Sequence, residues 1–207
     1  MKMVKAIILL SGNGSNFQNI IDNIKSGFLK IKICSVLSDN KNAYGLERAK
    51  KEKIKTIIIS SNNDYDSVTK TIIENSVDII ILAGYMKILP ASFVNKHIGK
   101  ILNIHPSLLP KYKGLNTHHR VINNKEKYHG ASVHFVTPDL DNGPVIIQGK
   151  VKIENDDTEN TLKEKVHKIE HKIYPLAIKW ISEKLVKKES DKCLFNNEIL
   201  TTPIEHI

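Results

Sequence analysis

Apolar and polar residues alternate along the first half of the chain in blocks whose spacing predicts a series of strands and helices. We expect a first strand at Val4–Leu10, because its residues Ala6–Leu10 form a continuous apolar run, which is typical of a strand buried on both faces of a parallel sheet. After a glycine-containing loop, apolar residues recur at helical spacing from Phe17 to Ile24. The alternation continues, with expected strands at Ile31–Ser38, Thr56–Ile59, Asp78–Ala83 and Lys100–His105, and expected helices at Ala43–Lys53, Ser67–Asn75 and Pro90–His97. This order predicts an α/β fold with a Rossmann-like, doubly wound, mostly parallel sheet.

The pattern changes in the second half. Ala131–Val136 and Val145–Ile153 are two β-like runs whose connection is too short for a crossover helix, so we expect them to pair antiparallel. A long C-terminal helix follows, capped by Asp157 or Thr158, with an apolar stripe and a kink expected at Pro175. We expect one domain over residues 1–188 and a loosely held C-terminal tail over residues 189–207.

The charge of the chain is unevenly distributed. Thirty-one Lys and Arg against 22 Asp and Glu give a net charge of +9, and the whole excess lies before residue 150. Two interpretations stay open: a solvated lysine-rich surface, or attraction for anionic substrates. Only Arg48 and Arg120 are arginines, and aromatic residues make up 6% of the chain without forming a stacking cluster. A nucleic-acid-binding module is therefore disfavoured.

Cysteine and histidine usage gives no sign of a metal site. Cys34 and Cys193 are the only cysteines, which predicts a reducing, intracellular setting. The nine histidines form no HExxH motif and have no cysteine partner, so we expect no metal; His134 is expected to pack or donate locally. No apolar stretch approaches the roughly 18 residues of a membrane span, and the first is too short for a signal peptide. We therefore expect a cytoplasmic protein with no membrane association.

The first candidate site is the loop Gly12–Asn16 after the first expected strand. It matches neither GxGxxG nor the Walker A pattern, so it is not a nucleotide fingerprint. Its two glycines allow close approach of a ligand, and the amides at the start of the next helix suit a phosphate. A tight turn in which Ser15 or Asn16 caps the helix is the other interpretation.

The second candidate site lies at the end of the strand Lys100–His105. Asn103 and His105 are two residues apart, so their side chains leave the same face of the strand. Asp141 lies in AspAsnGlyPro, which reads either as a simple turn or as a carboxylate that reaches a histidine. The three together make a candidate acid-base set.

Several motifs closely resemble the phosphoribosylglycinamide formyltransferase family over residues 1 to about 185. They are GlyAsnGlySerAsn in the first loop, LeuAlaGlyTyrMetLysIleLeu at 82–89, AsnIleHisProSerLeuLeuPro at 103–110, HisGlyAlaSerValHisPheVal at 129–136, and AspAsnGlyProValIle from residue 141. The resemblance implies the formyltransferase fold. It also implies formylation of glycinamide ribonucleotide, with 10-formyltetrahydrofolate as co-substrate and no metal; it leaves the oligomeric state open.

The resemblance also implies roles for particular positions. Asn103, His105 and Asp141 match the catalytic trio. The acceptor's phosphate is expected at Gly14, Ser15 and Asn16, and Glu170 matches a residue that contacts the ribonucleotide. The folate is expected against Met86, Lys87, Ile88, Leu89, Val136, Asp139 and Leu140.

Two departures from the family pattern stand out. Lys87 replaces an arginine that many members carry, and Ser60–Thr69 lacks the basic residue expected to contact the folate's acidic tail. The alternatives are a hydrolase of formylfolate on the same scaffold and a transferase with a different amine acceptor. Relatives of those kinds usually carry an additional domain.

Overall fold

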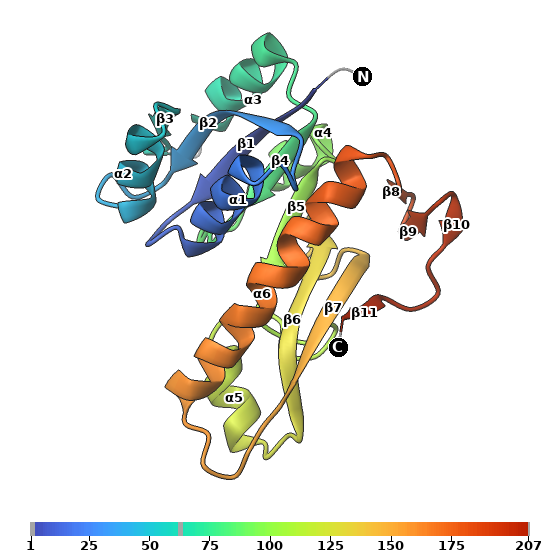
Figure 1. Cartoon of the computed structure of the whole chain (residues 1–207). Helices are drawn as coiled ribbons and strands as arrows, with labels where there is room; N and C mark the ends of the chain where they lie inside the picture. Colours follow the sequence, from blue (N-terminus) through green and yellow to red (C-terminus); the bar gives the residue numbers. More distant parts are fainter. Residues whose placement is uncertain (1–2, 62–63, 207) are drawn as a thin grey trace. The chain divides into compact units, whose positions relative to one another are not determined.

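The computed structural model describes residues 3–61 and 64–206, and the chain divides into two compact units, residues 1–103 and 104–207 (Figure 1). The first unit alternates strands and helices: β1 (Val4–Leu10), α1 (Ser15–Lys25), β2 (Ile31–Ser38), α2 (Tyr44–Lys51), β3 (Lys55–Ile58), α3 (Asp64–Asn75), β4 (Ile79–Leu82) and α4 (Ala91–Lys96). The next strand, β5 (Ile101–His105), begins in the first unit and ends in the second.

The strands of the first unit are all parallel, in the order β5-β4-β1-β2-β3. The chain builds outward from β1 to β3 and then returns to the other side of β1 with β4. Because each crossover is right-handed, this reversal sends the later helices to the opposite face of the sheet. In agreement, α1 packs on α2, and α3 packs on α4.

The reversal creates a switch point at the carboxyl ends of β1 and β4, the place where open α/β sheets bind ligands. Ser11 joins the loops that follow these strands. Its backbone N–H donates to Gly84 O at 3.0 Å, and its hydroxyl accepts from Met86 N at 2.8 Å. The same hydroxyl donates to Asp39 Oδ1, 2.6 Å away, after β2. One serine therefore holds three loops together.

The central strands form the core of the first unit. Every residue from Ala6 to Leu10 is fully buried, and all four residues of β4 are buried. Continuous apolar runs fold this way because a central parallel strand is covered on both faces and has no solvent side for polar residues.

The second unit contains α5 (Thr117–Asn123), β6 (Tyr128–Phe135), β7 (Val145–Lys152), α6 (Glu159–Ser182), β8 (Val186–Glu189), β9 (Lys192–Phe195), β10 (Glu198–Ile199) and β11 (Ile204–His206). As predicted, β6 and β7 pair antiparallel. Figure 1 shows α6 running alongside these two strands, which it contacts. The buried positions of α6 include Leu162, Val166 and Ile173 of the predicted apolar stripe.

The long helix begins at a capping box. The Thr158 hydroxyl accepts from Thr161 N at 3.2 Å, and the Thr161 hydroxyl accepts from Thr158 N at 2.9 Å. Asp157, the other predicted cap, instead binds Lys165 Nζ at 2.6 Å. The α-helix continues through Pro175 to Ser182.

The C-terminal segment differs from the prediction. Residues 189–206 are not loosely held, because β8, β9 and β10 form an antiparallel sheet and β11 pairs in parallel with β7. Cys193 and Leu194 are buried, at 3% and 7% exposure. Strand β8 has no apolar pattern in the sequence, because Lys187 and Lys188 make up half of it. The single domain over residues 1–188 stays a prediction.

The predicted fold class is confirmed: parallel strands alternate with helices in the first unit, and antiparallel strands and a long helix follow in the second. Within residues 3–61 and 64–206, no helix combines the length and apolar character needed to cross a bilayer.

Candidate active site

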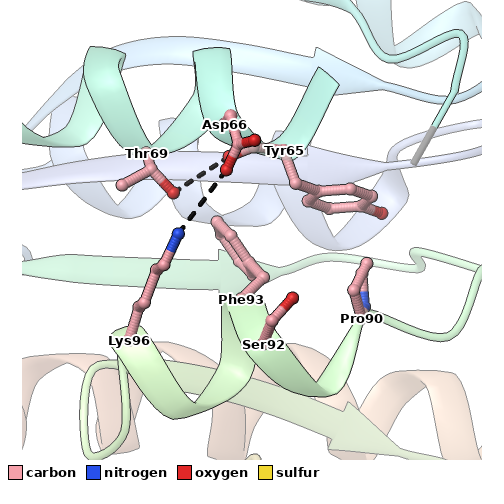
Figure 2. A pocket seen from close by; sticks show the side chains of 7 residues that line it. All are labelled: Tyr65, Asp66, Thr69, Pro90, Ser92, Phe93 and Lys96. Atoms are coloured by element: carbon pink, nitrogen blue, oxygen red, sulfur yellow. Dashed lines mark hydrogen bonds and ion pairs between the residues drawn. The ribbon is translucent and has the colours of Figure 1, made fainter. Parts of the chain in front are cut away.

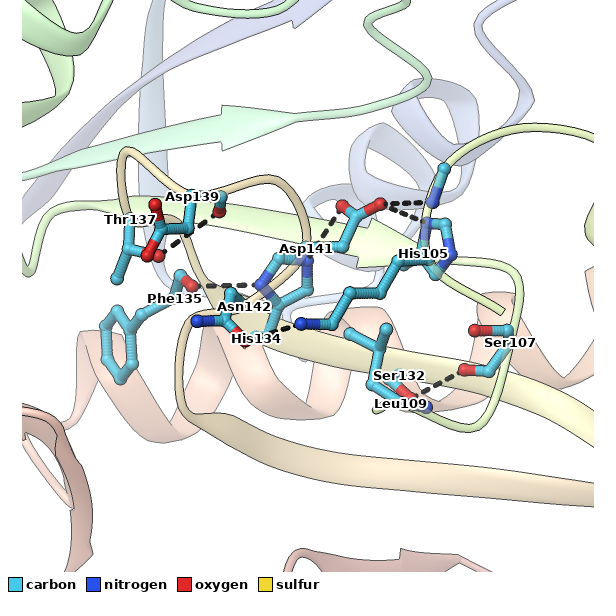
Figure 3. A network of polar contacts seen from close by, with 12 residues as sticks. His105, Ser107, Leu109, Ser132, His134, Phe135, Thr137, Asp139, Asp141 and Asn142 are labelled. Atoms are coloured by element: carbon cyan, nitrogen blue, oxygen red, sulfur yellow. Dashed lines mark hydrogen bonds and ion pairs between the residues drawn. The ribbon is translucent and has the colours of Figure 1, made fainter. Parts of the chain in front are cut away.

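The second unit brings together two residues of the predicted catalytic trio that are far apart in sequence. His105 ends β5, and Asp141 lies in the loop between β6 and β7 (Figure 3). The distance from His105 Nδ1 to Asp141 Oδ2 is 3.4 Å, and both side chains are buried, with 7% and 9% exposure. The predicted contact between carboxylate and imidazole is confirmed.

Asp141 is held by the backbone as well as by histidine. Its Oδ2 accepts from Gly114 N at 2.9 Å, and its own backbone is left-handed, with φ 46°. A buried carboxylate is costly unless it is paired and hydrogen-bonded, and here the amide and the imidazole meet that need. The loop conformation therefore fixes which groups this carboxylate faces.

The other ring nitrogen of His105 is also engaged. Nε2 lies 2.9 Å from the carbonyl oxygen of Tyr112, which only accepts, so Nε2 carries a proton. Nδ1 faces the Asp141 carboxylate. Both nitrogens thus face acceptors, an arrangement that suits the doubly protonated imidazolium. The Tyr112 contact was not predicted, because a backbone carbonyl leaves no mark in the sequence.

Asn103 precedes His105 by two residues on β5, where it is half-buried and pairs in register with Leu82 of β4. Alternation along the strand puts the Asn103 and His105 side chains on one face. It stays a prediction that the Asn103 side chain meets the pair formed by His105 and Asp141.

His134 is a further polar neighbour of this site. Its Nδ1 donates to Phe135 O at 2.9 Å, which confirms the predicted local hydrogen bond, and its Nε2 lies 3.7 Å from Asp141 Oδ1. Burial lowers the pKa of His134 well below its ordinary value, so the ring is neutral at pH 7. His134 therefore adds no positive charge beside Asp141 at this pH.

A buried network fixes the loop after β5. The Ser132 hydroxyl donates to Ser107 O at 2.6 Å (Figure 3). It accepts from Leu109 N at 3.0 Å and from Gln148 Nε2 at 2.9 Å. Gln148 Nε2 also donates to Leu109 O at 2.8 Å. Sequence reasoning missed this network, although alternation along β6 puts Ser132 and His134 on one face.

Two of the remaining histidines, His118 and His129, contact each other. His129 Nε2 lies 3.0 Å from His118 Nδ1, so one ring donates and the other accepts. Burial lowers the pKa of both, that of His129 to about 4. In the described part of the chain, no group of three or more His, Cys, Asp or Glu is arranged to hold a metal.

The glycine loop lies in the first unit, between β1 and α1. Gly14 is the N-cap of α1 with φ 74°, and no side chain caps the helix, so the interpretation with a Ser15 or Asn16 cap is wrong. A Cβ on Gly14 would lie 2.8 Å from Gly45 Cα, so this position combines a left-handed backbone with a close contact to α2.

The predicted folate residues lie on loops in both units. In the first unit, Met86 and Ile88 are each 71% exposed, whereas Leu89 is buried. Neighbouring exposed apolar side chains of this kind are available to a ligand. In the second unit, Leu140 is 52% exposed and Val136 is half-buried. The Asp139 carbonyl accepts from Thr137 Oγ1 at 3.3 Å. The role of these residues and of exposed Lys87 stays a prediction.

Glu170, predicted to contact the acceptor, lies on α6 and is only 8% exposed. Of the stretch Ser60–Thr69, residues 62 and 63 lie outside the described residues. Figure 2 shows the pocket between α3 and α4, about 260 Å³ in volume and lined by Tyr65, Asp66, Thr69, Pro90, Ser92, Phe93 and Lys96. None of the predicted site residues lines it.

The comparison with protein families identifies the class of protein. The formyl transferase family model matches residues 4–178, and the chain belongs to this family. The resemblance drawn from the motifs is therefore confirmed.

Within that family, the chain is similar to phosphoribosylglycinamide formyltransferases. It is 41% identical over 200 residues to the enzyme of that name from Escherichia coli (strain K12), covering 94% of each chain. It is 44% identical over 187 residues to the one from Haemophilus influenzae, covering 87% of this chain and 88% of that one. The solved structure of the Coxiella burnetii phosphoribosylglycinamide formyltransferase matches with a TM-score of 0.94 and 40% identity, covering 100% of both chains.

Proposed function

We propose that this protein transfers the formyl group of 10-formyltetrahydrofolate to the primary amine of glycinamide ribonucleotide, in purine biosynthesis in the cytoplasm. The buried pairing of His105 with Asp141 is the observation that carries the proposal. The similarity to enzymes named phosphoribosylglycinamide formyltransferase, over 94% of both chains in one case, supports the choice of acceptor.

In this mechanism the amine attacks the formyl carbon and forms a tetrahedral intermediate. The carbonyl oxygen gains negative charge, which hydrogen-bond donors must stabilise. We assign this role to the Asn103 amide and to the protonated imidazole of His105. The reaction uses no covalent enzyme intermediate and no metal.

The contacts of His105 support Nε2 as the nitrogen that acts on the substrate. Nδ1 faces Asp141 at 3.4 Å, so the proton offered to the oxyanion is that on Nε2. In the structure this N–H donates to Tyr112 O at 2.9 Å. Substrate binding must therefore exchange that carbonyl for the substrate oxygen, while Asp141 keeps its contact with Nδ1.

Asp141 has a second task in this mechanism. The attacking amine must lose a proton, and the folate nitrogen that leaves must gain one. A carboxylate close to the reacting atoms can relay this proton, directly or through a water molecule. The amide of Gly114, which donates to Oδ2 at 2.9 Å, keeps the carboxylate oriented during the transfer.

The binding residues complete the proposal. Gly14, Ser15 and Asn16 bind the phosphate of the acceptor, and Glu170 binds another part of the ribonucleotide. Met86, Lys87, Ile88, Leu89, Val136, Asp139 and Leu140 contact the folate. No nucleic acid takes part.

The test measures tetrahydrofolate formation with and without glycinamide ribonucleotide. We expect product only when the acceptor is present, and a fall in kcat of about 100- to 1000-fold for His105→Ala and for Asp141→Asn. His119→Ala and Asp156→Asn alter exposed residues of the same types in the same unit and are expected to stay within about twofold of the parent.

Three outcomes contradict the proposal. Folate product that appears equally without the acceptor identifies a hydrolase, and turnover only with another amine identifies a different transferase. Near-full turnover in both His105→Ala and Asp141→Asn shows that the catalytic assignment is wrong.

A further inference from the structure

We propose that Arg48 is a positioning residue for the acceptor's phosphate, because it fixes the loop between β1 and α1 whose amides bind that phosphate. The inference rests on the proposed function, which assigns the phosphate to Gly14, Ser15 and Asn16. It adds a residue from α2 that does not itself touch the reacting atoms.

All three guanidinium nitrogens of Arg48 donate to this loop or to the helix that follows it. Nε donates to Asn13 O at 2.9 Å, and Nη2 donates to Asn13 Oδ1 at 2.8 Å. Nη1 donates to Gln18 Oε1 at 3.0 Å. Arg48 therefore binds the chain on both sides of Gly14, the N-cap of α1.

The guanidinium is itself held in place. Its Cζ lies 4.8 Å from the centroid of the Tyr44 ring, one helical turn earlier on α2. The neighbouring Glu47 pairs with Lys50 at 2.7 Å. Among the described residues no carboxylate forms an ion pair with Arg48. The planar donor group thus faces the loop with its positive charge intact.

The contact with Asn13 O sets the direction of the next amide. The Asn13–Gly14 peptide is trans and planar, so its carbonyl and its N–H point in opposite directions. Arg48 binds the carbonyl from the side of α2, and the N–H of Gly14 therefore points away from α2.

The start of α2 supports the same loop at two neighbouring positions. Gly45 N donates to Gly12 O at 3.1 Å, and a Cβ on Gly14 would lie only 2.8 Å from Gly45 Cα. The loop is therefore fixed against α2 from Gly12 to Gly14. This presents the positive end of α1 in one orientation, which lowers the entropic cost of binding an anion.

The experiment separates this positioning role from the charge of Arg48. Arg48→Met removes the donors, Arg48→Lys keeps the charge but not the planar fork, and Lys51→Met removes an exposed charge from the same helix. For Arg48→Met we expect KM for glycinamide ribonucleotide to rise about 10- to 100-fold, with KM for 10-formyltetrahydrofolate within about twofold. For Arg48→Lys we expect KM for glycinamide ribonucleotide to be at least about fivefold above that of the parent. For Lys51→Met we expect it to stay within about twofold of the parent.

Hydrogen exchange in the free protein provides a readout that needs no substrate. Arg48→Met and Arg48→Lys should speed exchange in the segment 12–18, and leave exchange in β1 unchanged. Lys51→Met should change neither. Because Arg48→Lys keeps the stem and the charge, it remains a test if Arg48→Met does not fold.

The outcomes separate the two proposals. If the parent protein forms product without the acceptor or not at all, the proposed function fails, and the phosphate role of the loop fails with it. If the parent is active but Arg48→Lys matches it in KM and exchange, or if both KM values rise together, only the positioning role of Arg48 is wrong.

Discussion

At the scale of single residues, Asp141 shows how the site depends on backbone conformation. A left-handed backbone turns this carboxylate toward Gly114 N, 2.9 Å away, and toward His105. The loop reaches this conformation because Gly143 approaches the end of β6 so closely that a Cβ there would lie 1.8 Å from Phe135 O. Phe135 N in turn donates to Pro144 O at 3.1 Å.

Gly143→Ala should therefore distort the loop that carries Asp141. We expect a loss of about 1–3 kcal/mol in the free energy of unfolding, together with a lower kcat, because the new methyl group cannot fit beside the carbonyl. Denaturant unfolding and the formyl-transfer assay measure the two effects. Gly12→Ala is the stability control, since nothing lies within 4 Å of its Cβ; an equal loss in that variant would contradict the steric explanation.

Ser132→Ala tests the buried network behind the site. The change leaves Leu109 N without the acceptor that it has at 3.0 Å and removes the hydroxyl that donates to Ser107 O. Unsatisfied buried groups cost about 1–3 kcal/mol, so unfolding should show a loss of that size. Ser92→Ala changes an exposed serine on α4 and should stay within about 0.5 kcal/mol. A loss in Ser132→Ala no larger than in the control would mean that the network adds no stability.

The residues that sequence reasoning found and missed differ in one respect. His105 and Asp141 were predicted because their side chains carry the chemistry and belong to recognisable motifs. The Tyr112 carbonyl and the approach of His134 to Asp141 depend on loop backbone, including a left-handed Tyr112 with φ 56°, which no periodicity reveals.

Among the contacts between helices and strands, His118 on α5 hydrogen-bonds to His129 on β6. Since one ring donates to the other at 3.0 Å, the pair cannot hold two full positive charges without strong repulsion. Burial lowers the pKa of His129 to about 4, and the charges of His118 and His105 add to that effect.

This pair predicts a loss of stability in mild acid. An unfolded histidine binds its proton near pH 6.5, whereas folded His129 stays neutral down to about pH 4. The unfolded state therefore binds more protons in that interval, and the free energy of unfolding falls as the pH drops, by at most about 1.4 kcal/mol per pH unit. Denaturant unfolding of the parent and of His129→Gln from pH 7 to pH 4 measures the slope. Equal slopes in the two proteins would exclude His129 as the cause.

Most strands and helices are predicted to within a few residues, because burial on both faces leaves apolar runs at Ala6–Leu10 in β1 and throughout β4. The errors have local causes. Helix α3 begins at Asp64, before its apolar periodicity, because that carboxylate accepts from Ser61 N at 2.8 Å. Strand β6 begins at Tyr128, before the expected start at Ala131, because His129 and Gly130 also pair with β7.

At the scale of the whole molecule, the net charge of +9 lies in the part of the chain before residue 150. Both proposed substrates are anions, so a positive field should raise their rate of encounter. We expect kcat/KM for glycinamide ribonucleotide to fall several-fold between about 0.05 and about 0.5 M salt, with kcat nearly constant, because salt screens encounter and not chemistry. A kcat/KM that does not change with salt would favour the other interpretation, a solvated lysine surface.

His105 Nε2 donates its hydrogen bond to the main-chain carbonyl of Tyr112, not to a side chain. Replacing Tyr112 by alanine removes the phenol, which donates to Glu126 Oε1 at 2.9 Å, but the backbone carbonyl remains part of the chain. Removing it requires an edit to the polypeptide backbone itself, such as a deletion that shortens the loop.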